Sequence, residues 1–276
     1  ENKGKLLWLS GSLLVLTPMI YSTAKLFTPF LLLFLLITYR KELFSLQKRN
    51  ILNSILITLF FGLITSYSVL FSGGSQRFNY ISVFSDPTTE SEVGTARLND
   101  AHARGEKGTG LNPTILDRVI HNKFTYWGQK IENNLIETLS TDFLFVSGDP
   151  NPRHSMDGYG MFFKIESLLL IVGLILFFSD KQQNKSTKNL IVFFFFFGIL
   201  PSALTREGGN HSTRLILILP PLLFLISYAF VKLSKYLRLI YLGLLLVSFG
   251  IYSHNYYSHY PSDSERWWHY GWMPAV

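Results

Sequence analysis

Residues 190–200 read LIVFFFFFGIL, and residues 215–230 read LILILPPLLFLISYAF. A further run, Phe30–Thr38, reads FLLLFLLIT. Apolar residues make up 48% of the 276 positions and charged residues only 16%, whereas soluble domains carry about 25% charged residues. Long apolar runs are typical of helices that cross a lipid bilayer. The composition therefore predicts a membrane protein, and it excludes a cytosolic enzyme and a nucleic-acid-binding module in spite of the net charge of +7.

Seven apolar runs are candidates for membrane-spanning helices. They are Leu6–Ile20, Leu26–Tyr39, Ile51–Phe71, Met161–Phe178, Leu190–Leu204, Leu215–Val231 and Leu237–Ser253. Several are shorter than the ~20 residues that a perpendicular helix needs to cross the hydrocarbon core. Two alternatives fit Leu6–Tyr39, a hairpin of two spans or one kinked helix. We expect an all-α polytopic membrane protein of about seven spans.

The basic residues predict the orientation of these spans. Connectors 40–50, 179–189 and 232–238 carry four, three and three Lys or Arg residues, whereas 21–25 and 205–214 carry one and two. Basic connectors of membrane proteins face the cytoplasm. With a hairpin over Leu6–Tyr39, all the strongly basic connectors fall on one side. We therefore expect a cytoplasmic N-terminus and an outer C-terminus.

This topology divides the chain into four parts. Residues 1–71 are three membrane spans, 72–160 an extracytoplasmic loop, 161–253 four further spans, and 254–276 the start of an extracytoplasmic C-terminal segment. Because the chain begins with Glu1 and no signal peptide precedes the first apolar run, we expect a fragment of a longer protein that lacks the N-terminal part.

The long outer loop contains two different kinds of sequence. Residues 85–110 are polar and Gly-rich, which predicts a mobile loop. Residues Thr114–Leu139 have apolar side chains at helical spacing, which predicts one amphipathic helix lying on the membrane interface. The apolar positions are Leu116, Ile120, Phe124, Trp127, Ile131, Leu135 and Leu139.

Polar residues gather at four places that the topology assigns to the outer side. These are residues 21–25, 147–155, 204–214 and 259–268. The third place is the most informative. Gly208-Gly209 is suited to a tight turn with positive φ, and His211 and Arg214 lie three residues apart at the predicted start of a span, where they share a helical face.

A helix N-terminus with an Arg side chain is a favourable place for phosphate. We therefore predict that His211 and Arg214 bind a lipid-linked phosphate, together with Arg153, His154 and Lys25. The alternatives are that Arg214 only reaches lipid headgroups, that residues 147–155 form an ordinary loop in which Asp149 caps its own backbone, and that Lys25 is an interfacial anchor. With no Cys, the chain has no disulfide, thiolate metal site or Cys nucleophile. The sequence indicates no cofactor and no metal site; a divalent metal is compatible with it but not indicated.

Several motifs together resemble one family. Residues 143–155 (FLFVSGDPNPRHS) resemble the long outer loop of bacterial integral-membrane glycosyltransferases of the C superfold, relatives of the dolichyl-phosphate-mannose–protein mannosyltransferases and the aminoarabinose transferases. Residues 200–205, 211–214 and 219–221 look like the later outer loop and the next span of that family. Residues 21–29 and 121–123 also fit, although Arg is more usual where Lys25 stands.

The resemblance implies a membrane glycosyltransferase that takes a sugar from a polyprenyl-phosphate donor on the outer side of the bacterial cytoplasmic (inner) membrane. Its partners would be that donor, the lipid bilayer and an acceptor that the sequence does not identify, with no nucleic acid. The family's acceptor-activating carboxylate would lie upstream of Glu1, so the catalytic residue of this chain is unknown. Two alternatives stay open, a polytopic transporter or flippase and a non-catalytic membrane subunit that binds lipid-linked glycans.

Overall fold

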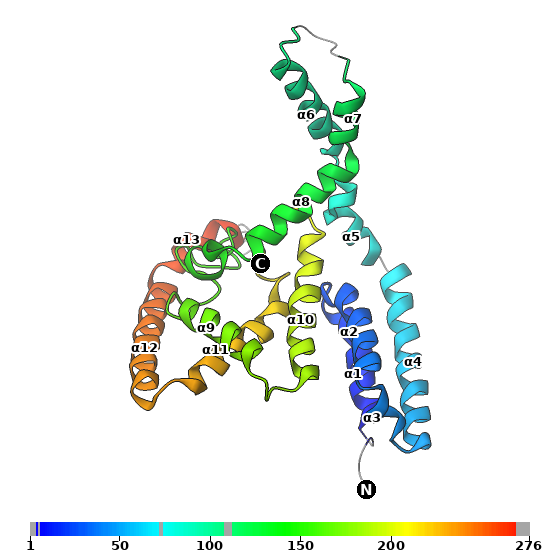
Figure 1. Ribbon diagram of the computed structural model, residues 1–276, viewed down its shortest axis with the longest axis vertical. Coiled ribbons are helices and arrows are strands. Elements are labelled where there is room, and N and C mark those ends of the chain that lie inside the picture. Colours follow the sequence, from blue (N-terminus) through cyan, green and yellow to red (C-terminus); the bar gives the residue numbers. More distant parts are fainter. Residues whose placement is uncertain (1–3, 5, 72–73, 108–111, 269–276) are drawn as a thin grey trace, which may run out of the picture. The chain divides into compact units, whose positions relative to one another are not determined.

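The computed structural model describes residues 4, 6–71, 74–107 and 112–268 (Figure 1). The described residues form helices and no strand, apart from an isolated antiparallel pairing of Ser82 with Thr205. The chain divides into two compact units. The first comprises Glu1–Leu135 with Leu200–Gly208, and the second comprises Ile136–Ile199 with Gly209–Val276.

The first unit begins with an apolar helical bundle. It contains α1 (Leu7–Ile20), α2 (Ala24–Thr38), the short α3 (Arg40–Phe44) and the long α4 (Lys48–Phe71). Helix α1 packs against both α2 and α4. A Cβ atom at Gly11 would lie 2.3 Å from Thr58 Oγ1, so glycine permits the close approach of α1 to α4. Leu6–Tyr39 is therefore two contacting helices and not one kinked helix, while the crossing of the membrane by each of them stays a prediction.

The rest of the first unit, from Gly74 onward, is more helical than the sequence predicted. It contains α5 (Gly74–Ile81), η1 (Val83–Ser85), α6 (Thr89–Ala103), α7 (Ile115–Ile120) and α8 (Lys123–Thr138), and α8 runs on into the second unit. The prediction of a mobile loop over 85–110 is wrong for α6, while residues 108–110 lie outside the described part of the chain. Helices α6 and α7 lie side by side (Figure 1).

The predicted single helix over Thr114–Leu139 is interrupted at His121-Asn122. The Asn122 side chain accepts hydrogen bonds from the N–H groups of Phe124 and Thr125, at 2.9 and 3.2 Å, which is the bonding of a helix N-cap. Polar side chains occupy the buried face of α8, because Asn134 and Thr138 are 6% and 0% exposed. Much of the predicted apolar stripe is exposed, with Phe124 at 79%.

The second unit contains most of the later helices. They are η2 (Asp142–Val146), α9 (Glu166–Ser179), α10 (Lys185–Ala203), η3 (Ile216–Ile218), α11 (Leu219–Lys232), α12 (Lys235–Ser258), α13 (Tyr260–Ser264) and η4 (Glu265–Trp268). Helices α9 and α11 pack closely, since a Cβ atom at Gly173 would lie 2.0 Å from the Leu225 carbonyl oxygen. The fully buried Phe177 ring makes edge contacts with Phe224 and Tyr228 in the same interface.

Each of the seven predicted apolar runs contains a helix, although α9 begins only at Glu166 and α11 only at Leu219. Among the described residues, three of these helices have the length and apolar composition needed to cross a membrane: α4, α10 and α12. The other four, in the regions of α1, α2, α9 and α11, are shorter. No residue of α12 is buried in the protein, which fits a helix whose surroundings are lipid. The described residues thus contain three candidate membrane-spanning helices, which is compatible with a membrane protein, and the seven-span topology stays a prediction.

Candidate functional site

A constrained loop in the second unit presents Asp149. Gly148 has φ of +72°, and a Cβ atom there would lie 2.4 Å from the Tyr159 carbonyl oxygen, so only glycine fits. The Asp149 Oδ1 atom accepts the N–H of Asn151 at 2.9 Å, a side-chain turn that the sequence predicted as one alternative. The Tyr260 hydroxyl donates to the Pro152 carbonyl at 2.6 Å. These contacts hold the loop in one shape.

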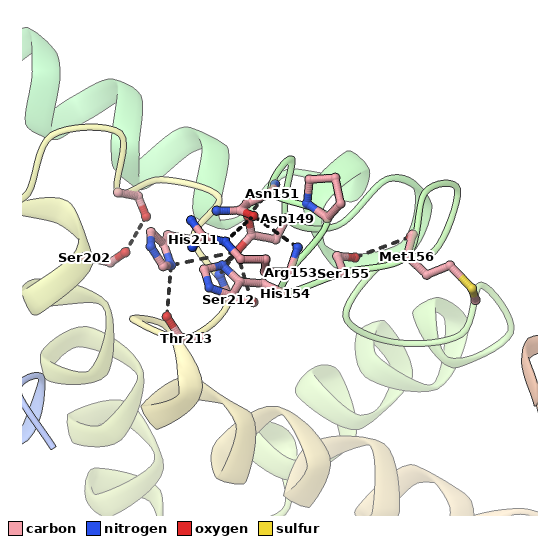
Figure 2. Close-up of polar contacts among 12 residues, drawn as sticks. Asp149, Asn151, Arg153, His154, Ser155, Met156, Ser202, His211, Ser212 and Thr213 are labelled. Carbon is pink, nitrogen blue, oxygen red and sulfur yellow. Dashed lines mark hydrogen bonds and ion pairs between the residues drawn. The ribbon is translucent and has the colours of Figure 1, made fainter. Parts of the chain in front are cut away.

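A second loop brings residues 211–214 to this carboxylate. The Thr138 hydroxyl donates to the Gly209 carbonyl at 2.7 Å, and this bond fixes the chain just before His211. The Ser212 N–H and hydroxyl both donate to Asp149 Oδ2, at 2.8 and 3.0 Å (Figure 2). Asp149 is only 6% exposed, so these bonds satisfy a buried carboxylate oxygen.

Two histidines face the same carboxylate oxygen. The distance from Asp149 Oδ2 to His154 Nδ1 is 3.0 Å, and to His211 Nδ1 it is 3.8 Å (Figure 2). The ring centroids of His154 and His211 are 4.9 Å apart. Burial, followed by the positive charge of Arg214, lowers the pKa of His211 to about 4, against the opposing effect of the Asp149 carboxylate. The His211 imidazole is therefore neutral at pH 7.

The polar cluster borders an apolar cavity. The cavity has a volume of about 170 Å³ and is lined by Phe143, Leu144, Met161, Phe162, Ser212, Leu215, Ile216, Ile218 and Leu219. Ser212 belongs to both features, because it binds Asp149 and also lines the cavity. Two backbone hydrogen bonds, from Met161 to Phe143 and from Phe162 to Leu144, hold part of the cavity wall together. A polar group and an apolar chain of one ligand could thus bind side by side.

The structure brings together several of the predicted phosphate-binding residues. His154 and His211 are in ring contact. Arg214 is half-buried in the same loop as His211, and Arg153 is exposed beside His154, with its Nε atom 3.4 Å from Asn151 Oδ1. Lys25 belongs to the first unit, in the first turn of α2, and its assignment to this site stays a prediction.

Two details of the sequence prediction are wrong. His211 and Arg214 do not share a helical face, since they lie in a turn in which the Arg214 N–H donates to the His211 carbonyl at 3.0 Å. Helix α11 begins only at Leu219, where the following prolines suit the first helical turn. The positive φ expected at Gly208-Gly209 occurs instead at Glu207, at 51°. Gly208 is needed for a different reason, because a Cβ atom there would lie 2.0 Å from the Ser202 carbonyl oxygen.

The sequence prediction omitted Asp149 and Ser212 from the site. The sequence predicts a capping role for Asp149 and matches it to no catalytic role, and Asp149 does cap its own loop through Oδ1. Its Oδ2 atom joins the two loops, which are far apart in the sequence. One sequence signal indicates the role of Asp149. The turn Gly148-Asp149-Pro150 lies close to Arg153-His154, and such a turn holds an acidic side chain near a histidine.

The three residues of the motif His121-Asn122-Lys123 contact other residues of the first unit. His121 Nε2 lies 2.8 Å from Asp100 Oδ2, Asn122 caps α8, and Lys123 Nζ lies 3.4 Å from Glu90 Oε1. In the aromatic tail, Trp267 and Trp268 are exposed, and Tyr270 and Trp272 lie outside the described residues.

Comparison of the chain with protein-family models, with characterised proteins and with solved structures finds no significant match. The resemblance to membrane glycosyltransferases therefore rests on the sequence motifs, and the geometry of the Asp149 cluster has to support any function on its own.

Proposed function

We propose that this protein is a membrane glycosyltransferase that moves a sugar from a polyprenyl-phosphate donor to an acceptor on the outer side of the bacterial inner membrane. The proposal includes the seven-span topology, with residues 147–155 and 205–214 outside. The donor is amphiphilic, with an anionic phosphate between a sugar and a long apolar chain.

The observation that carries the proposal is the junction at Ser212. On one side of Ser212 lie Asp149 and two imidazoles, with Arg214 in the same loop. On the other side lies the apolar cavity of about 170 Å³. Ligand sites are mostly apolar with a few convergent polar groups. Here the polar residues lie beside an apolar cavity, as the phosphate of a polyprenyl phosphate lies beside its apolar chain.

The reaction places specific demands on the site. The bond between the anomeric carbon and the phosphate oxygen breaks, a bond from the anomeric carbon to the acceptor oxygen forms, and the acceptor loses a proton to a base. The electron pair of the broken bond stays on the phosphate. A guanidinium stabilises that charge because it matches phosphate oxygens in shape and stays protonated. We assign this role to Arg214 and then to Arg153.

The histidines have a separate role in the proposal. A neutral imidazole donates one hydrogen bond, so His211 can bind a phosphate oxygen without adding charge. His154 is assigned as a further hydrogen-bonding contact to the phosphate. Asp149 positions both loops through its hydrogen bonds with Ser212 and Asn151, and the role of base is not assigned to it. The base remains unassigned, and Lys25 is retained as a further phosphate contact.

The test is Arg214→Ala in the protein embedded in its native membrane, with transfer of radiolabelled sugar from polyprenyl-phosphate sugars as the readout. Loss of one group that stabilises transition-state charge costs about a hundredfold to a thousandfold in turnover. Arg40→Ala is the matched control, since Arg40 is an exposed cation of the predicted cytoplasmic connector 40–50.

The expected result is a loss of transfer in Arg214→Ala, with normal membrane insertion and normal turnover in Arg40→Ala. Equal turnover in the two variants would contradict the assignment of Arg214. Binding of polyprenyl phosphate without any transfer in the unmodified protein would favour the lipid-binding subunit instead.

A further inference from the structure

We infer that Asp149, His154 and His211 form a binding site for a divalent transition-metal ion, with zinc as the expected occupant. Each of the three side chains offers one ligand atom, and the three atoms all lie within 4.8 Å of one another. The inference concerns metal binding alone and does not depend on the proposed transfer of a sugar.

The ligand chemistry favours zinc over magnesium or calcium. Imidazole nitrogen suits zinc, copper, iron and nickel, whereas magnesium and calcium prefer oxygen ligands. Two histidines with one carboxylate leave an open coordination position, as in zinc sites that bind water or substrate. A ring nitrogen of each imidazole can supply the lone pair that a metal ion binds.

The spacing of the ligand atoms is close to that of a zinc site. Zinc bonds of about 2.0–2.1 Å in a tetrahedral arrangement place neighbouring ligand atoms about 3.3 Å apart. The distances from Asp149 Oδ2 to His154 Nδ1 and His211 Nδ1, 3.0 and 3.8 Å, lie on either side of this value. Small movements of the three side chains would bring their ligand atoms to zinc-bonding distance. The metal ion would then replace the hydrogen atom between Asp149 Oδ2 and His154 Nδ1.

The surroundings fix the ligands as metal sites require. Bound carboxylates and imidazoles are normally held by further hydrogen bonds. Ser212 donates two hydrogen bonds to Asp149 Oδ2, and the Asn151 N–H donates to Oδ1. The ligands come from two loops, so a bound ion would join the segment after η2 to the segment before η3.

Arg214 identifies the ligand that would complete the coordination. A guanidinium and a metal ion are both positive, so an anion between them relieves their repulsion. A phosphate can do this because its oxygens bind a metal ion and also accept hydrogen bonds from a guanidinium. This step alone rests on the proposed function, because it takes the donor phosphate as the anion. Metal binding and phosphate binding are measured separately, so failure of one can be told apart from failure of the other.

The experiment measures metal in protein purified in detergent without chelators. Zinc content is determined by mass spectrometry, and cobalt is titrated into metal-free protein while the visible absorption of tetrahedral Co²⁺ is recorded. We expect one equivalent of zinc, and at least tenfold weaker cobalt binding in His211→Gln and in His154→Gln. Ser212→Ala should weaken binding about tenfold through the position of Asp149.

His254→Gln is the matched control. The His254 and His259 rings also pair, with centroids 5.8 Å apart, but both are exposed and His254 is not part of the three-ligand cluster. His254→Gln should bind zinc as the unmodified protein does. Folded, unmodified protein that binds no zinc at micromolar concentration overturns the inference, as does equal loss in His211→Gln and His254→Gln. If either cluster variant fails to fold, the unmodified protein alone decides the question.

Discussion

Two buried carboxylates outside the long apolar helices have very different partners. Asp117, in α7, is 1% exposed and forms a two-point ion pair with Arg104, at 2.7 and 2.8 Å. Its Oδ2 atom also accepts the Thr114 N–H at 2.8 Å, as part of a capping box. Asp149 is similarly buried but interacts with Ser212, Asn151 and two imidazoles.

The difference between these partners indicates a structural role for Asp117 and a ligand-binding role for Asp149. The Arg104 guanidinium compensates the charge of Asp117, and the hydrogen bond between them is the main reason that the pKa of Asp117 is lowered well below its usual range. The neighbours of Asp149 are instead the Ser212 and Asn151 donors and two imidazoles, which are possible metal ligands. Asp117 therefore holds two helices together, whereas Asp149 is available for a ligand.

The largest expected effect comes from comparing Asp149→Asn with Asp117→Asn. Replacing Asp149 turns an amide toward the Ser212 donors and removes the charge that faces the imidazoles, so turnover should fall at least about a hundredfold. Asp117→Asn should loosen the α6–α7 pair and leave turnover near that of the unmodified protein. Sugar transfer and hydrogen exchange, measured on both variants, check this prediction. Equal losses of turnover would remove the distinction between the two carboxylates.

Gly148→Ala should displace Asp149 by a steric effect. Alanine at a left-handed φ costs about 1–2 kcal/mol, and at Gly148 the added Cβ atom would also lie 2.4 Å from the Tyr159 carbonyl. Gly158 has nearly the same φ, +75°, with no atom within 4 Å of the added Cβ position. Thermal unfolding and cobalt titration compare the two variants.

We expect both alanine variants to be destabilised, and only Gly148→Ala to lose metal binding. Loss of metal binding in Gly158→Ala as well would show that general strain in the loop, and not the position of Asp149, controls the site.

Acid should open the α6–α7 pair before it affects the neighbouring helices α5 and α8. Since the folded-state pKa of Asp117 is depressed, its stabilising contribution is complete above the unfolded-state pKa and is lost as the pH falls toward the folded value. Hydrogen exchange of α6 and α7 should therefore accelerate below about pH 4. Arg104→Ala should show fast exchange already at pH 7. An Arg104→Ala variant with the exchange profile of the unmodified protein would contradict this account of the pair.

The smallest expected effect is that of Lys123→Ala. Lys123 and Glu90 form an ion pair at 3.4 Å, with side chains 57% and 83% exposed. Exposed pairs contribute about 0–1 kcal/mol, so exchange in α6 should stay within error of the unmodified protein. A large acceleration would mean that exposed ion pairs, and not Asp117, hold α6 and α7 together.

The apolar helices and the polar helix α6 differ in how well the sequence predicts them. The apolar runs form helices as predicted, because hydrophobicity along one segment is a local property. Helix α6 was missed because it is polar and its partners are distant in the sequence: Arg97 donates to the His121 carbonyl at 2.8 Å, and Arg104 binds Asp117. Glu90 in its first turn and His102 in its last are favourable helix signals that the Gly-rich composition obscured.

The candidate site was predictable in its residue types and not in its arrangement. His154, His211 and Arg214 were selected because polar residues gathered at predicted outer ends of helices. Their meeting at Asp149 depends on the turn at Gly148 and on the Ser212 hydrogen bonds, which join segments far apart in the chain. Spacing along one segment cannot predict such a contact.

Photochemical crosslinking tests the central claim most directly. A polyprenyl phosphate with a photoreactive group next to the phosphate is added to membranes that contain the protein, and the modified peptides are mapped by mass spectrometry, with unlabelled polyprenyl phosphate and polyprenol as competitors. The account predicts crosslinks in residues 147–155 and 211–216 that polyprenyl phosphate suppresses and polyprenol does not. Crosslinks confined to the exposed apolar stripe of α7 and α8, or equal competition by polyprenol, would contradict a phosphate site at Asp149, His154 and His211.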